Sequence, residues 1–183
     1  MKFYERTIVQ ILLDLDGVLV DFMGGIHRAL GGPPIDPWQW TYNKWEWYKD
    51  LGWTFEQMNA VCTFDFWANL KWTPDGHDIL REVYREQLYF VTCPMPNIYS
   101  ASGKMAWIRK NLPLYESQII VSTVPKEFFA APDRLLIDDK NENVDEFEKA
   151  GGKAILINRP WNRGYKRYNF ALEDFIWNFK QMI

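Results

Sequence analysis

The sequence predicts an α/β sandwich, in which a parallel β-sheet lies between layers of helices. Five short runs rich in β-branched residues and leucine have strand length, and segments with helical spacing separate most of them. Strands that alternate with helices in this way are joined by right-handed crossovers and therefore run parallel. A third observation is a stretch of about fifty residues after the first strand, which is too long for a plain loop and indicates an insertion.

The first expected strand, Ile8–Leu13, is a short run rich in β-branched residues and leucine that ends abruptly at Asp14, a pattern typical of a strand buried on both faces. Gly151-Gly152 supports a helix end before the last strand, because glycine accepts the left-handed conformation that follows a helix. The other strands are expected at Leu88–Thr92, Gln118–Ser122, Arg134–Ile137 and Lys153–Ile157, and the helices at Gly76–Gln87, Ser100–Leu112, Asn141–Ala150 and about Asn169–Met182.

The inserted stretch contains helical patches and no convincing strand. It begins with a helical pattern at Phe22–Leu30, is broken by Gly31-Gly32-Pro33-Pro34, and has a second candidate helix at Phe55–Cys62. We therefore expect residues 21–73 to form a small helical cap, inserted into a core domain made of residues 1–20 and 74–183.

Composition limits the partners. The chain has 183 residues, with 21 Lys plus Arg against 24 Asp plus Glu, and the net charge of −3 disfavours a long nucleic-acid polymer as ligand. No apolar run approaches the roughly 20 residues of a membrane-spanning helix, so no membrane partner is expected. Two cysteines, Cys62 and Cys93, and a Met1–Arg6 segment unlike a secretory leader favour reduced thiols and a cytoplasmic location. A disulfide and a homodimer both stay open.

Acidic and polar side chains follow the expected strands at the points where they end. Because ligands of open parallel sheets bind beyond the carboxyl ends of the strands, we expect these side chains to meet. Several carboxylates at one edge repel one another unless a cation is present, and an all-oxygen ligand set favours Mg²⁺ with room for water and a substrate phosphate. The residues are Asp14 and Asp16 after the first strand, Thr92 and Cys93 after the second, Lys126 after the third, and Asp138 and Asp139 after the fourth.

Each of these signals also has a purely structural interpretation. Asp-x-Asp-Gly suits a turn, and one carboxylate of Asp138-Asp139 suits the cap of the next helix. Thr92 alone suits a local backbone hydrogen bond, and Lys126 alone a solvated charge. Their order along the chain, each near a strand end, favours a functional site.

These residues carry a resemblance to a known superfamily. Asp14-Leu15-Asp16-Gly17-Val18-Leu19-Val20-Asp21, Thr92, Lys126 and Asp138-Asp139 resemble the four motifs of the haloacid dehalogenase-like (HAD) phosphohydrolases. Asp21-Phe22, Leu135-Leu136-Ile137-Asp138-Asp139 and Arg159-Pro160-Trp161-Asn162 resemble the 5′(3′)-deoxyribonucleotidase family. The resemblance implies a HAD-like Rossmannoid three-layer sandwich with a parallel sheet, and an Mg²⁺-dependent phosphatase that hydrolyses nucleoside monophosphates.

The resemblance also implies residue roles. Asp14 would attack phosphorus and form an aspartyl-phosphate, and Asp16 would protonate the leaving oxygen and then activate water. A second aspartate at this position points to phosphate ester hydrolysis. Thr92, Cys93 and Lys126 would bind the phosphate. Mg²⁺ would be held by the Asp14 carboxylate, the Asp16 carbonyl and the pair Asp138 and Asp139, of which Asp139 is favoured as the direct ligand.

The cap segment is rich in aromatic residues, most of which we expect to pack its interior. A few are candidates for stacking on a nucleobase, namely Phe22, Phe66 and Trp67. His27 and His77 are expected to have no role in the site. Lys104 is a candidate phosphate contact, and Trp107 a core residue. The basic cluster, Arg159, Arg163, Lys166 and Arg167, is either a solvated loop or a contact to a phosphate or a partner.

Two other functions stay open. The chain could be a HAD phosphatase that acts on another small phosphorylated metabolite or on a 3′-phosphate nucleic-acid end. It could also be a catalytically silent nucleotide-binding module, which the intact Asp14-x-Asp16 pair disfavours.

Overall fold

The structure is a computed structural model that describes residues 10–32, 46–164 and 171–183. The expectations for Met1–Arg6, for Ile8 and Val9, and for Lys166 and Arg167 lie outside these ranges, as do the cap aromatics Trp38, Trp40, Tyr42 and Trp45. None of the helices in the described ranges combines the length and hydrophobicity needed to cross a bilayer.

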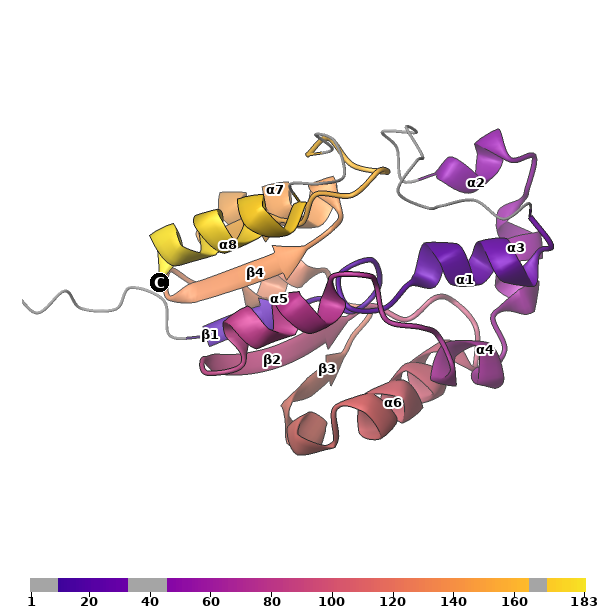
Figure 1. The fold of residues 1–183 in the computed structure, drawn as a ribbon, viewed down its shortest axis with the longest axis horizontal. Helices are drawn as coiled ribbons and strands as arrows, with labels where there is room; N and C mark the ends of the chain where they lie inside the picture. Colours follow the sequence, from indigo (N-terminus) through magenta and orange to yellow (C-terminus); the bar gives the residue numbers. More distant parts are fainter. Residues whose placement is uncertain (1–9, 33–45, 165–170) are drawn as a thin grey trace, which may run out of the picture.

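A five-stranded parallel sheet forms the centre of the molecule, with the strand order β3-β2-β1-β4-β5 (Figure 1). The central strand, β1, pairs with β2 and β4, so that Leu13 lies opposite Phe90 and Ile137. The predicted fold class is confirmed. The strands are β1 (Gln10–Leu13), β2 (Gln87–Thr92), β3 (Ile119–Val121), β4 (Arg134–Asp138) and β5 (Lys153–Leu156).

Helices cover both faces of the sheet, because alternate residues of each strand point to opposite sides. Ile11 and Leu13 share one core with residues of α5 (Gly76–Val83), α6 (Ser100–Asn111) and α8 (Ala171–Met182). Leu12 belongs to a second core with residues of α7 (Asn141–Lys149). The 3₁₀ helices η2 (Pro113–Gln118) and η3 (Lys126–Phe129) lie in the connections on either side of β3. The result is three layers.

One helix is shorter than expected. The spacing predicts a helix over Gly76–Gln87, whereas α5 ends at Val83 and Gln87 opens β2. Gln87 pairs with Gln10 of β1 in the sheet, and this pairing overrides the helical pattern of the local sequence.

Between β1 and α5, the described residues 14–32 and 46–75 form the helices α1 (Phe22–Ala29), α2 (Trp47–Asp50), α3 (Phe55–Val61) and α4 (Phe64–Ala68). They lie beyond the tips of the strand arrows (Figure 1). Side-chain oxygens of Asp21, Thr54 and Thr63 cap the N-termini of α1, α3 and α4. Because α4 packs against α6 of the expected core, the two parts are in direct contact. The boundaries at residues 20/21 and 73/74 stay a prediction.

Candidate active site

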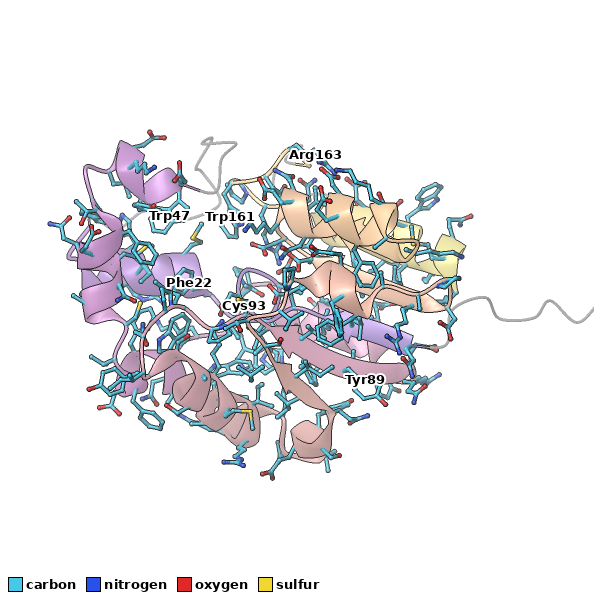
Figure 2. All side chains as sticks on the ribbon, turned by 180° about the vertical axis from the view of Figure 1, so that it is seen from behind. Phe22, Trp47, Tyr89, Cys93, Trp161 and Arg163 are labelled. Carbon is cyan, nitrogen blue, oxygen red and sulfur yellow. The ribbon has the colours of Figure 1, made fainter. Side chains whose placement is uncertain are left out.

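A cavity of about 360 Å³ opens at the carboxyl ends of β1, β2 and β4, a size that suits a small ligand. Two cap residues, Phe22 and Trp67, form part of its wall, and Figure 2 shows Phe22 beside Cys93. The cavity therefore lies between these two residues and the carboxyl end of the sheet. Its lining includes most of the predicted site residues, namely Asp14, Asp16, Thr92, Cys93, Lys126 and Asp139.

Three carboxylates meet at one side of this cavity. Asp14, Asp138 and Asp139 are buried, and one oxygen of each lies within 4.8 Å of the others. The pairing of β1 with β4 brings them together, and the Asp14 backbone N–H donates to the carbonyl of Ile137 at 2.9 Å. The sequence-based expectation that acidic groups from two distant segments meet is therefore confirmed.

Burial and mutual repulsion disfavour the ionised forms of the carboxylates in this cluster. Burial raises the pKa of Asp14 to about 7, with Asp138 and Asp16 adding to the rise and Lys126 opposing it. Burial, together with the charges of Asp138 and Asp14, raises the pKa of Asp139 well above its usual range. The Lys126 ammonium contacts Asp14 and Asp138 but not Asp139, so a divalent cation would stabilise the ionised forms of the three buried carboxylates. The all-oxygen donor set fits a hard ion such as Mg²⁺.

Lys126 lies between two of the carboxylates. Its Nζ is 2.6 Å from Oδ1 of Asp14 and 2.5 Å from Oδ2 of Asp138. Burial lowers the pKa of Lys126, but the adjacent carboxylates of Asp138 and Asp14 outweigh it and raise the pKa overall. Lys126 therefore carries a fixed positive charge next to Asp14, where a phosphoryl group would arrive.

The two acidic residues after β4 have different surroundings. Asp138 accepts hydrogen bonds from Lys126, from the Lys140 backbone N–H at 2.8 Å and from the Asn143 amide at 3.0 and 3.1 Å. Asp139 accepts from the Trp161 indole N–H through Oδ2 at 2.6 Å. Since both oxygens of Asp138 are used by the protein, the geometry favours Asp139 as the direct metal ligand.

Asp16 does not belong to the cluster of Asp14, Asp138 and Asp139. Its Oδ2 pairs with Nζ of Lys104, a buried residue of α6. The same ammonium donates to Oγ1 of Thr92 at 2.9 Å and to the Cys93 carbonyl at 2.8 Å. All three N–H groups of Lys104 thus serve protein acceptors, which differs from the expected phosphate contact.

The aromatic side chains on the cap side of the cavity, Phe22 and Trp67, stack on each other. Phe22 and Trp67 lie parallel, with ring centroids 5.1 Å apart and an interplanar angle of 4°. Phe66 packs edge-on against Trp67 at 5.3 Å and against Phe22 at 6.2 Å. Phe66 is behind the wall and does not line the cavity, so its position does not support the expected substrate contact.

Arg159 was expected either in a solvated loop or in contact with a phosphate or a partner, and its position in the structure contradicts these expectations. It is fully buried, makes two 2.8 Å contacts with the Asp75 carboxylate, and donates through Nε to the Gly17 carbonyl at 2.5 Å. Arg159 is neither solvated nor in contact with the cavity, and its hydrogen bonds stabilise the loop after β1. Arg163 is exposed and pairs with Asp145.

Trp161 and Asn162 are further contributors that sequence reasoning gave no role. The Asn162 amide donates to the carbonyls of Asp139 and Ile157, both at 2.7 Å. Residue 17 must be glycine, because its φ is 76° and because a Cβ there would lie 2.1 Å from Oδ2 of Asp139. The only signal in the sequence was the resemblance of Arg159-Pro160-Trp161-Asn162 to a family motif.

The remaining expectations concern packing. His27 lies edge-on to Trp53, and His77 stacks on Trp72 with centroids 3.9 Å apart. Trp107 is buried in the core. Cys62 and Cys93 are free thiols, so the open question of a disulfide is answered for this structure.

The fold and this site define a HAD-type phosphohydrolase, with an acidic cluster at the carboxyl end of a central parallel strand and the helices that follow this strand packed near it. The family described as 5′ nucleotidase, deoxy (pyrimidine), cytosolic type C protein matches residues 6–174. The chain belongs to this family, and it is a phosphoric monoester hydrolase. No curated protein sequence matches the chain.

Solved structures support the fold. The HAD-hydrolase YfnB from Bacillus subtilis, bound to magnesium, has 14% identity and a TM-score of 0.56, covering 96% of this chain and 98% of its own. A predicted phosphatase from Clostridium acetobutylicum has 14% identity and a TM-score of 0.56, covering 95% and 99%. A HAD-superfamily hydrolase from Geobacter sulfurreducens has 15% identity and a TM-score of 0.55, covering 100% of both chains.

Proposed function

We propose that the protein is an Mg²⁺-dependent 5′(3′)-deoxyribonucleotidase, which hydrolyses nucleoside monophosphates through an aspartyl-phosphate on Asp14. The observation that carries this proposal is the position of Asp14: its carboxylate lines the cavity, contacts Lys126, and belongs to the acidic cluster with Asp139. A nucleophile in this place has a cationic neighbour to hold the phosphoryl group that it attacks.

In the first step, an Asp14 oxygen forms a bond to phosphorus while the ester P–O bond breaks. The departing sugar oxygen takes the proton of the Asp16 carboxylic acid, because an alkoxide is a poor leaving group. Lys126 and the hydroxyl of Thr92 stabilise the charge on the nonbridging oxygens, together with the Cys93 backbone N–H.

In the second step, a water molecule attacks phosphorus and gives one proton to the Asp16 carboxylate. The bond between phosphorus and the Asp14 oxygen breaks, which releases inorganic phosphate and restores the Asp14 carboxylate and the Asp16 acid. The two residues therefore return to their starting states.

Asp14, Asp139 and the carbonyl of Asp16 would hold Mg²⁺, with Asp138 positioning Lys126 beside them. The bound ion would neutralise the buried carboxylates and the phosphate charge. The described residues supply the oxygen donors that this ion prefers.

The cavity supports a small nucleotide as substrate. Phe22 and Trp67 give it an aromatic wall on the cap side, and base–aromatic stacking typically contributes about 1–3 kcal/mol per base. Its volume and the net charge of −3 fit a monophosphate better than a polymer. The family description supports a cytosolic location and a deoxynucleotide.

The test is phosphate release from a panel of monophosphates, with Mg²⁺ and with EDTA. The panel holds pyrimidine and purine deoxyribonucleotides and ribonucleotides, each as 5′ and 3′ esters, together with a sugar phosphate and a 3′-phosphorylated oligonucleotide. We expect metal-dependent turnover of deoxyribonucleotides that is abolished in Asp14→Asn. Faster turnover of the sugar phosphate or the oligonucleotide would replace the substrate assignment with the corresponding alternative.

A further inference from the structure

We propose that Trp67 is a positioning residue, whose ring face holds the ammonium of Lys104 and through it Asp16 and the hydroxyl of Thr92. The inference rests on the proposed function. By this inference, Trp67 affects the proton transfer from Asp16 to the leaving oxygen, in addition to any contact that it makes with a nucleobase.

The contact between Trp67 and Lys104 is buried on both sides. Nζ of Lys104 lies 4.9 Å from the ring centroid of Trp67, within the range of a cation–π interaction. Trp67 is 1% exposed and the side chain of Lys104 is 3% exposed. Because water is excluded, the attraction between ring and ammonium is stronger than at a surface.

Local structure keeps the Trp67 ring in place. Phe22 stacks on it in parallel, and the Thr63 hydroxyl caps the short helix α4 that carries Trp67. Gly103, the neighbour of Lys104 on α6, allows α4 to come close, since a Cβ there would lie 2.4 Å from Cβ of Trp67. The sequence Gly103-Lys104 thus brings the ring and the ammonium together.

Lys104 in turn orients two groups of the site. An ammonium only donates hydrogen bonds, so Oγ1 of Thr92 accepts from it at 2.9 Å and the Thr92 hydroxyl proton is left to point at a phosphoryl oxygen. The Lys104 ammonium also pairs with Oδ2 of Asp16, which fixes the carboxyl that must face the leaving oxygen. Movement of Lys104 would therefore misplace the proton donor of the first step.

This arrangement predicts a dependence on the leaving group. A nitrophenyl phosphate releases a stable phenolate and needs little protonation, whereas a simple alkyl phosphate needs the proton of Asp16. Loss of the ring face should impair the alkyl ester more. The value of kcat/KM reports only the steps up to the first irreversible one, here phosphoryl transfer to Asp14, so the later attack of water does not enter the comparison.

The experiment measures kcat/KM of the full chain with Mg²⁺ on an alkyl phosphate and on nitrophenyl phosphate, neither of which carries a nucleobase. For Trp67→Leu we expect the ratio of alkyl to nitrophenyl activity to fall by roughly tenfold. Trp67→Phe keeps a ring face and should hold this ratio within about twofold of wild type. The control, Trp47→Leu, removes a buried cap tryptophan that does not line the cavity and should leave the ratio unchanged.

Lys104→Met, which keeps the length of the side chain without its charge, should reproduce the fall in the ratio, and the double variant with Trp67→Leu should fall no further. If Trp67→Leu does not fold, the single variant Lys104→Met provides the test. An equal loss on both esters would overturn the proposal in favour of a merely structural Trp67. Unchanged activity of Trp67→Leu on both esters would overturn the proposal, and a loss confined to the nucleotides of the monophosphate panel would assign Trp67 to base stacking instead. No turnover of any monoester by the wild type would overturn the proposed function itself.

Discussion

Trp161 donates its indole N–H to Oδ2 of Asp139 at 2.6 Å, which bonds the loop after β5 to the acidic cluster (Figure 2 labels Trp161). The bond fixes the orientation of the Asp139 carboxylate and occupies one of its two oxygens. Such partners of a metal ligand typically change metal affinity by about 10–100-fold when they are removed.

Trp161→Phe should therefore weaken Mg²⁺ binding by about tenfold or more, with little change of fold. Titration calorimetry of Mg²⁺ into the purified protein measures this without reference to turnover. Trp177→Phe is the matched control, because Trp177 is an exposed tryptophan of α8. Equal affinity of the Trp161 variant and this control would contradict the role assigned to the hydrogen bond.

Arg159→Met should lower the free energy of unfolding by about 3 kcal/mol, because it leaves the carboxylate of Asp75 and the Gly17 carbonyl without their buried partner. We place the value at the lower end for buried pairs since Asp75 retains some solvent access. Urea denaturation measures the change. The exposed pair of Arg163 with Asp145 offers a control: Arg163→Met should cost at most about 1 kcal/mol. Similar losses in both variants would be inconsistent with the difference in burial.

The sequence predicts the sheet and the meeting of carboxylates because both follow from local patterns. The β-branched and leucine-rich run Ile8–Leu13, which ends abruptly at Asp14, is typical of a buried strand, and parallel strands place their carboxyl ends at one edge. Asp14 and Asp139 could therefore be placed together without knowledge of the strand order.

Other features depend on where side chains point, which no local pattern specifies. Arg159 and Asp75 are far apart along the chain, and their pairing exists only once α5 and the loop after β5 are packed. The end of α5 at Val83 was missed because sheet pairing of Gln87 outweighs helical spacing. Phe66 and Trp67 have equal claims as neighbours in the sequence, but only Trp67 lines the cavity.

Asp139→Asn should abolish the stabilisation that Mg²⁺ provides and yet raise the Tm of the metal-free protein. In the absence of a cation, the buried Asp139 carboxylate is disfavoured by desolvation and by the charges of Asp138 and Asp14, which raise its pKa. A neutral amide removes this unfavourable term. Thermal melts with EDTA and with Mg²⁺ measure both effects.

The matched change is Asp138→Asn, which breaks the buried ion pair with Lys126 and should lower the stability of the metal-free protein by about 3 kcal/mol. We therefore expect Asp139→Asn to raise the Tm of the metal-free protein and Asp138→Asn to lower it. A lower Tm for metal-free Asp139→Asn would refute the assignment of Asp139 as the repelled, cation-binding member of the pair.

The two thiols should differ sharply in reactivity. Burial, followed by the negative charge of Asp16, raises the pKa of Cys62 to about 12, and its Sγ donates to the Met58 carbonyl. Cys93 is exposed and lines the cavity. Because the thiolate is the reactive form, a thiol reagent at about pH 8 should label one cysteine per native chain and both after unfolding. Cys93→Ser should abolish the native labelling, and inorganic phosphate should slow it in the wild type by occupying the cavity. Rapid labelling of both thiols in the native protein would show that Cys62 is not enclosed by the cap.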